Sequence, residues 1–86
     1  MPYIWDISAW EEYEGWQQED RKTLKRINQL LRDIARTKGD GVGKGELLKG
    51  GQGLRSMRID KKNRLVFRIE GDDVYIISCK GHYSDR

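Results

Sequence analysis

The sequence has few of the residues that cross-link a fold or bind a metal ion. Its 86 residues include one cysteine, Cys79, and one histidine, His82. A single cysteine cannot form a disulfide within the chain, which agrees with a reducing compartment. One histidine and one cysteine cannot supply the three or four ligands of a usual transition-metal site. We therefore expect no metal site.

Long apolar runs are also missing. No stretch approaches the roughly 18 apolar residues of a membrane span. The first residues, MPYIWDISAW, have no basic region followed by an apolar stretch, so they do not resemble a secretory signal. These absences predict a cytoplasmic protein without a membrane partner, and the length predicts one domain over residues 1–86.

Charge is distributed unevenly along the chain, although the net charge is only +3. Residues 1–20 contain six acidic side chains and no basic one, whereas residues 21–69 contain fifteen basic and four acidic side chains. A basic block of this kind is typical of proteins that bind polyanions such as RNA. The alternative is a solvated helix face followed by a lysine-rich turn.

The first half of the chain predicts a short strand at residues 3–6 and two helices. Ser8, with Glu11 three residues later, has the pattern of a capping box at the start of the first helix. A second helix is expected over about residues 20–36. The apolar stripes expected to face the core are Trp10, Tyr13 and Trp16 in the first helix, and Leu24, Ile27, Leu30, Leu31 and Ile34 in the second.

Residues 38–53 contain seven glycines in sixteen positions and predict a mobile loop. Glycine there permits close approach of the backbone to a ligand, or serves only as a flexible connection. The segment lacks the GxxxxGK[ST] pattern of a nucleotide-binding loop.

Three strands are expected after this loop, at residues 54–59, 63–70 and 73–79. The predicted fold class is α+β, with a three-stranded antiparallel meander that joins the N-terminal strand in a small twisted sheet. Apolar alternation pairs Ile59 with Asn63 and places Arg58 opposite Arg64. A turn at residues 71–72 then pairs Arg64 with Cys79.

This register puts Arg58, Arg64 and the chain leading to His82 on one face of the sheet. Two arginines directly opposite each other repel by roughly 0.2 to 1 kcal/mol, so the arrangement favours a bound anion such as phosphate. The alternative is that each arginine pairs with a carboxylate, such as Glu46 or one from the acidic N-terminus.

A carboxylate, an imidazole and arginines suit RNA hydrolysis through the 2′-hydroxyl group. That reaction needs a base for the hydroxyl proton, an acid for the leaving 5′-oxygen and cations for the charge on phosphate. From the residues alone, a single histidine in a tail is more often an incidental surface group.

Four segments add a family resemblance: GKGELLK (43–49), SMRI (56–59), NRLVF (63–67) and CKGHY (79–83). They resemble, in order, the motifs GKPExLK, SRRI, HRLVY and HY of the YoeB/Txe toxins, in the RelE superfamily of mRNA interferases. The helical half, with IWDISAWEEYEGWQ, is also similar to the tryptophan-rich start of that family. The resemblance implies a RelE/YoeB-like, microbial-RNase-like fold.

The same resemblance implies a bacterial endoribonuclease that enters the A site of the 30S ribosomal subunit and cuts mRNA without a cofactor. The implied partners are a YefM/Axe-like antitoxin, the ribosome with its mRNA, and operator DNA only through the antitoxin complex; the family also offers precedent for homodimers. Implied catalytic residues are Glu46 as base, His82 as acid, Arg64 for charge and Tyr83 for positioning. Implied phosphate-binding residues are Lys44, Lys49, Arg58 and Arg68.

The sequence departs from the family motifs at several positions. Gly45, Arg55 and Met57 replace a proline, an aromatic residue and an arginine, and Asn63 replaces a histidine. Two rival hypotheses remain: a weakened or inactive RNA-binding relative that acts through antitoxin and DNA, and a thiol enzyme built on Cys79 and His82.

Overall fold

The computed structural model describes residues 2–37, 46–47 and 53–81, and it forms one five-stranded sheet with two helices. The elements are β1 (Tyr3–Trp5), α1 (Ile7–Glu19), α2 (Arg21–Thr37), β2 (Glu46–Leu47), β3 (Arg55–Arg58), β4 (Arg64–Glu70) and β5 (Asp73–Ser78). The strand order is β1-β5-β4-β3-β2, with β1 parallel to β5 and the other pairs antiparallel. The predicted α+β class is confirmed.

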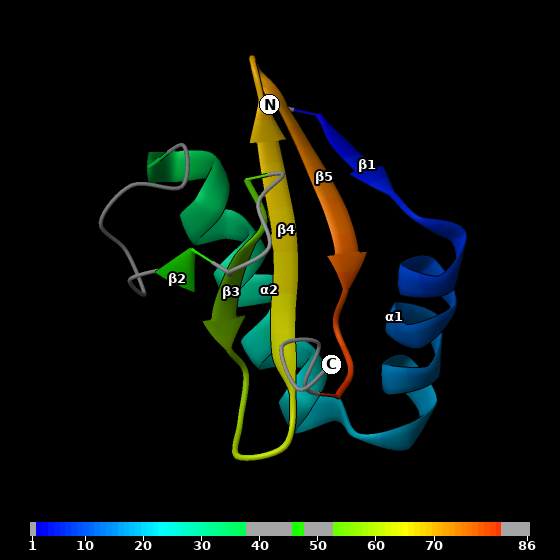
Figure 1. Ribbon diagram of the computed structural model, residues 1–86. Helices are drawn as coiled ribbons and strands as arrows, with labels where there is room; N and C mark the ends of the chain where they lie inside the picture. Colours follow the sequence, from blue (N-terminus) through cyan, green and yellow to red (C-terminus); the bar gives the residue numbers. More distant parts are fainter. Residues whose placement is uncertain (1, 38–45, 48–52, 82–86) are drawn as a thin grey trace.

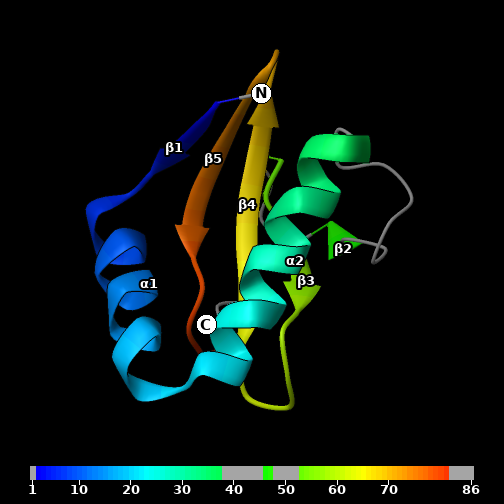
Figure 2. The same ribbon diagram turned by 180° about the vertical axis from the view of Figure 1, so that it is seen from behind.

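Both helices lie on the same side of the sheet, as the two opposite views show (Figures 1 and 2). α2 crosses behind β4 and β3 in Figure 1, and α1 packs against α2 and β5. The residues buried between these layers include Ile27, Leu30, Ile34, Leu65, Phe67, Val74 and Ile76, each at most 1% exposed. Side chains alternate along a strand. In β3 and β4, the residues that alternate with the core-facing ones therefore point to the face that neither described helix covers.

The start of α1 differs from the prediction. The N-cap is Asp6, without a side-chain capping bond, and Ser8 lies inside the helix. The backbone N–H of Asp6 donates to the carbonyl of Ile76 at 3.0 Å, and its carbonyl accepts from the N–H of Trp10 at 2.9 Å. The pairing of β1 with β5 thus fixes where the chain leaves the sheet, and this overrides the capping preference of Ser8.

The stripe predicted for α1 is only partly buried. Trp16 is 6% exposed, whereas Trp10 is 42% exposed. Trp10 packs instead against the rings of Trp5 and Tyr13, with centroid distances of 5.5 and 5.6 Å. The outer end of the stripe is therefore an aromatic cluster at the edge of the sheet.

α2 follows the prediction to within one residue at each end. Asp20 precedes it, and its Oδ1 accepts from the backbone N–H groups of Lys22 and Thr23 at 3.1 and 3.2 Å. The Thr23 hydroxyl donates to Oδ2 at 2.9 Å, and these bonds lower the pKa of Asp20, with the side-chain bond contributing most. Asp20 therefore supplies the cap that a helix N-terminus needs.

The β3–β4 register is confirmed, and the β4–β5 register is corrected near its end. Arg58 lies opposite Arg64, and Glu70 lies opposite Asp73 across the Gly71-Asp72 turn, where Gly71 has a φ of 58°. The register then shifts between Val66 and Phe67. Because of this bulge, Arg64 does not lie opposite Cys79 as predicted.

The physical reason for the shift lies in α1. The N–H and the carbonyl of Cys79 are bonded by the side chains of Glu12 and Trp16, at 2.8 and 3.0 Å. They are therefore not available to β4, and the backbone N–H of Arg64 donates to the carbonyl of Gly81 at 3.1 Å instead. A bulge is the usual way in which a strand absorbs one extra residue.

The sheet also has a strand that the sequence did not predict. β2 pairs with β3, with Glu46 opposite Ser56 and Leu47 opposite Arg55. Residues 38–53 were expected to form a loop throughout; apart from β2 and Gly53, they lie outside the described residues. Among the helices described, none is long and apolar enough to cross a membrane.

Candidate functional site

Arg58 and Arg64 form a pair of facing cations on the side of the sheet that the helices leave uncovered. Their Cα atoms are directly opposite across β3 and β4, and Met57 and Leu65, the next residues along, are buried against the helices. Arg58 is exposed and Arg64 is half-buried. Arg58 forms no ion pair with any carboxylate whose side chain the structure describes, so the N-terminal acids do not neutralise it.

The side chain of Arg64 is held over β3. Its Nε donates a hydrogen bond to Oγ of Ser56, which is 1% exposed. Ser56 is the residue whose backbone lies opposite Glu46 of β2. The hydrogen bond therefore directs the guanidinium group toward the part of the sheet that Glu46 adjoins.

The backbone before His82 reaches Arg64 from the other side. Gly81 accepts from the backbone N–H of Arg64 at 3.1 Å, and its own N–H donates to Oδ1 of Asn63 at 2.9 Å. β2 pairs with β3, which pairs with β4 at Arg64, whereas residue 81 bonds Arg64 directly at the start of β4. The two segments thus approach Arg64 from two sides. The described backbone brings the two expected catalytic segments to one arginine.

The remaining predicted site residues have different outcomes. His82, Tyr83, Lys44 and Lys49 lie outside the described residues, and Glu46 is placed by its backbone pairing only. Arg68 shares the face of Arg64 but follows it by four residues in β4, which is about 13 Å along a strand. Its role at the arginine pair stays a prediction.

Local contacts occupy Arg68. Its Nε lies 2.9 Å from a carboxylate oxygen of Glu70, and its guanidinium carbon lies 4.6 Å from the centre of the Tyr75 ring. The ion pair lacks hydrogen-bond geometry at Nε, which has no hydrogen-bond partner among the described residues. Arg68 is thus held beside Tyr75, away from Arg58.

The thiol hypothesis does not fit the surroundings of Cys79. The residue is fully buried, and its Sγ lies 3.7 Å from the carbonyl oxygen of Ala9. Burial, followed by the nearby carboxylate of Glu12, raises the pKa of the Cys79 thiol to about 12. A thiolate nucleophile is not available near neutral pH.

Comparison with known proteins decides the family. Residues 5–83 match the model of the YoeB-like toxin of bacterial type II toxin-antitoxin systems. The chain belongs to this family. It is 39% identical over 84 residues to toxin YoeB of Escherichia coli K12, which covers 96% of this chain and 100% of that protein.

Solved structures of YoeB-like toxins share the fold. A YoeB/ParE toxin from Agrobacterium tumefaciens superposes with a TM-score of 0.88 at 40% identity, covering 96% of this chain and 100% of that one. The YoeB chain in a heterotetrameric YoeB-YefM complex from Staphylococcus aureus superposes with a TM-score of 0.84 at 40% identity, covering 96% and 98%. The architecture of two helices on a mostly antiparallel sheet is therefore that of the YoeB-like toxins.

Two residues of this YoeB-like site were missed by sequence reasoning. Ser56 orients Arg64, and Asn63 bonds the backbone of Gly81. The predicted pairing of Arg58 with Arg64 already implies that Ser56 and Val66 form the adjacent pair, so Ser56 had a signal. Asn63 had none, because its contact with Gly81 depends on the bulge in β5.

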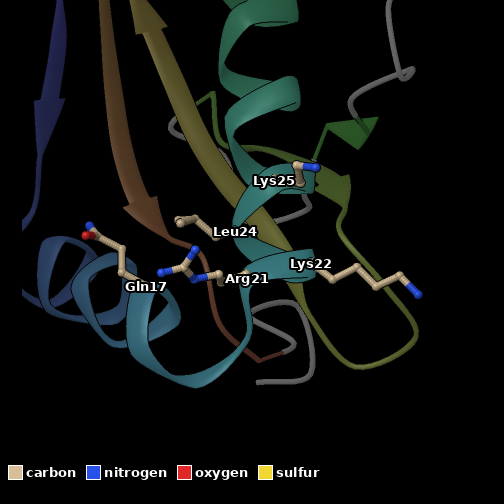
Figure 3. Close-up of a pocket in the computed structure, with 5 residues that line it drawn as sticks. All are labelled: Gln17, Arg21, Lys22, Leu24 and Lys25. Carbon is tan, nitrogen blue, oxygen red and sulfur yellow. The ribbon is translucent and has the colours of Figure 1, made fainter.

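A separate pocket of about 600 Å³ lies where α1 meets α2, on the helical side of the molecule (Figure 3). It is lined by Gln17, Arg21, Lys22, Leu24 and Lys25. None of these residues belongs to β3 or β4. The pocket is therefore not part of the arginine site of this YoeB-like toxin.

Proposed function

We propose that this YoeB-like toxin is an endoribonuclease that cuts mRNA in the A site of the ribosome and so stops translation. The reaction needs no metal. A 2′-oxygen of RNA attacks the adjacent phosphorus, the bond from phosphorus to the 5′-oxygen breaks, and the products are a 2′,3′-cyclic phosphate and a 5′-hydroxyl. One proton leaves the 2′-hydroxyl and one is added to the 5′-oxygen, so a base and an acid suffice.

The observation that supports this most strongly is the pair Arg58 and Arg64, with the backbone of Glu46 and of Gly81 on its two sides. Glu46 is the base that takes the 2′-hydroxyl proton. His82, the residue after Gly81, is the acid that protonates the 5′-oxygen. Arg64, held by Ser56 and supported by Arg58, stabilises the charge that grows on the phosphate oxygens.

The other candidate residues bind or align the RNA. Lys44 and Lys49 flank Glu46 in the sequence and contact the RNA backbone, with Arg68 farther along the same face of β4. Tyr83 aligns the substrate beside His82. Salt should weaken this part of the interaction, since each phosphate contact releases bound counterions.

The partners follow from relatives at about 40% identity. The S. aureus relative forms a complex with YefM and is also known as a dimer. We therefore propose that a YefM/Axe-like antitoxin binds and restrains this toxin in the bacterial cytosol, that the toxin contacts operator DNA only through that antitoxin, and that it forms homodimers. The whole chain, residues 1–86, acts as one domain.

Mapping of mRNA 5′ ends on ribosomes tests the catalytic proposal. Cells induced for the wild-type toxin should accumulate new 5′-hydroxyl ends at the A site, and cells induced for Glu46→Gln or His82→Ala at equal protein level should accumulate far fewer. Cleavage by all three proteins, or by none, would remove the assigned mechanism. Growth arrest that persists in both variants would favour RNA binding without catalysis.

A further inference from the structure

The chain beyond the end of β5 runs beside α1 (Figure 1). Two side chains of α1 bond this part of the chain. Glu12 Oε1 accepts from the N–H of Cys79 at 2.8 Å, and Trp16 Nε1 donates to the carbonyl of Cys79 at 3.0 Å. Cys79 is fully buried, so these bonds satisfy both of its backbone polar groups without water. α1 therefore fixes the path of the chain three residues before His82.

A second attachment comes from the β3–β4 turn. Oδ1 of Asn63 accepts from the N–H of Gly81 at 2.9 Å. Its Nδ2 donates to both carboxylate oxygens of Asp60, at 3.0 and 3.1 Å, and its backbone N–H donates to Oδ1 of Asp60 at 2.8 Å. Asn63 is 9% exposed. Its carboxamide is therefore buried, and the bonds to Asp60 hold it in the orientation that contacts Gly81.

Gly81 itself has a conformation that redirects the chain. Its φ is 81°, a region that other residues rarely adopt. Its carbonyl is bonded to Arg64, so both polar groups of the residue before His82 are bonded on the β4 side. The chain is thus held at residue 79 by α1 and at residue 81 by β4 and its turn.

We propose that Glu12, Trp16 and Asn63, here called the anchor residues, are positioning residues that fix, at Arg64, the backbone from which His82 follows. None of them contacts the reacting atoms; they act through the backbone of Cys79 and Gly81. This inference rests on the proposed role of His82 as the acid. A general acid must lie within hydrogen-bond reach of the leaving oxygen, and a displacement of 1 Å can cost about 10²-fold in rate.

Single-turnover cleavage of mRNA on programmed ribosomes, with toxin in excess, tests the proposal. Glu12→Ala and Asn63→Ala should each lower the cleavage rate about 10- to 100-fold, with the concentration dependence nearly unchanged. Glu12→Gln keeps an acceptor at Oε1 and should recover most of the rate. Glu14→Ala, an exposed glutamate of the same helix, is the matched control and should cleave like the wild type.

The decisive measurement repeats Glu12→Ala and Asn63→Ala in a His82→Ala background. If the anchor residues act only through His82, their substitution should then lower the cleavage rate by less than about two-fold, because the contribution of His82 is already lost. Rate losses as large in the His82→Ala background as in the wild-type background would overturn the proposal. If one variant fails to fold, the other tests the opposite end of the attachment, and Trp16→Phe removes the indole N–H while it keeps an aromatic ring in the core.

Proton NMR of the single histidine separates this proposal from the proposed function. The C2 proton resonance of His82 should shift in Glu12→Ala and Asn63→Ala, but not in Glu14→Ala. An unchanged resonance in both variants would overturn the anchor residues whatever the enzyme does. If His82→Ala cleaves normally, the catalytic assignment fails, and the NMR result still decides whether the anchors place the tail.

Discussion

The two faces of β4 alternate along one strand of seven residues but serve different purposes. Leu65 and Phe67 are fully buried against the helices, whereas Arg64 and Arg68 on the other face keep part of their side chains exposed. Side chains of the first face exclude water, and those of the second gather positive charge. Stability and the proposed function can therefore be changed separately within a single element.

Loss of Phe67 should have the largest effect on stability. Phe67 is 0% exposed at the centre of the core, so Phe67→Ala should reduce the free energy of unfolding by about 3 to 5 kcal/mol through lost burial and a cavity. Urea denaturation of the purified protein measures this loss. Phe67→Leu, which conserves more of the volume, should cost less than about 1.5 kcal/mol, and equal losses in the two variants would contradict the cavity explanation.

Substitution of Arg64 should lower the cleavage rate, in contrast to the loss of stability expected for Phe67. Arg64→Ala should lower single-turnover cleavage by about 10²- to 10³-fold, the usual loss when one donor to a developing negative charge is removed. Arg64→Lys keeps the charge but not the Nε donor that binds Ser56, so it should recover only part of the rate. A lysine variant as fast as the wild type would show that orientation by Ser56 is unimportant.

Val66 sharpens the comparison, because it lies between the two arginines of β4 and is nevertheless fully buried. Val66→Ala removes two methyl groups from a dry position and should cost about 1 to 2 kcal/mol of unfolding free energy. The same denaturation experiment measures it. A loss below about 0.3 kcal/mol would mean that the centre of this face contributes no structural support.

The smallest effect should come from Asp60, in the turn between the two strands. Burial acts to raise its pKa, but bonds from Lys62 and Asn63 outweigh burial, so the folded-state pKa lies below the ordinary value. The unfolded chain therefore binds more protons, and the contribution of Asp60 is complete above about pH 4 and is lost as the pH falls through the folded-state pKa.

Asp60→Asn should accordingly lose less stability than the wild type between pH 5 and pH 3. Urea midpoints at these two pH values measure the difference. A variant whose midpoint falls as much as that of the wild type would show that the hydrogen bonds at Asp60 do not couple its ionisation to folding.

Much of the fold followed from local patterns. The 3.6-residue spacing of Leu24, Ile27 and Ile34 predicted α2 within one residue at each end, and apolar alternation predicted that Arg58 faces Arg64. These features depend on residues close in sequence. The three-residue turn between β3 and β4 leaves almost no freedom in the register.

The errors share a different origin. Ser8 has the better capping pattern, yet the bond from Asp6 to Ile76 sets the start of α1. The register shift between Val66 and Phe67 depends on bonds to Cys79 from Glu12 and Trp16, which are more than sixty residues away from Cys79 in the sequence. No local propensity encodes such contacts.

The sequence by itself determined the element types, the arginine pair and, through its motifs, the family. Tertiary structure alone decided where α1 begins, that Glu46 joins the sheet as an edge strand, and that the tail meets Arg64 through Gly81 and not through Cys79. The reason is that periodicity reports which residues share a face, whereas the path of the backbone between faces depends on which distant groups satisfy its hydrogen bonds.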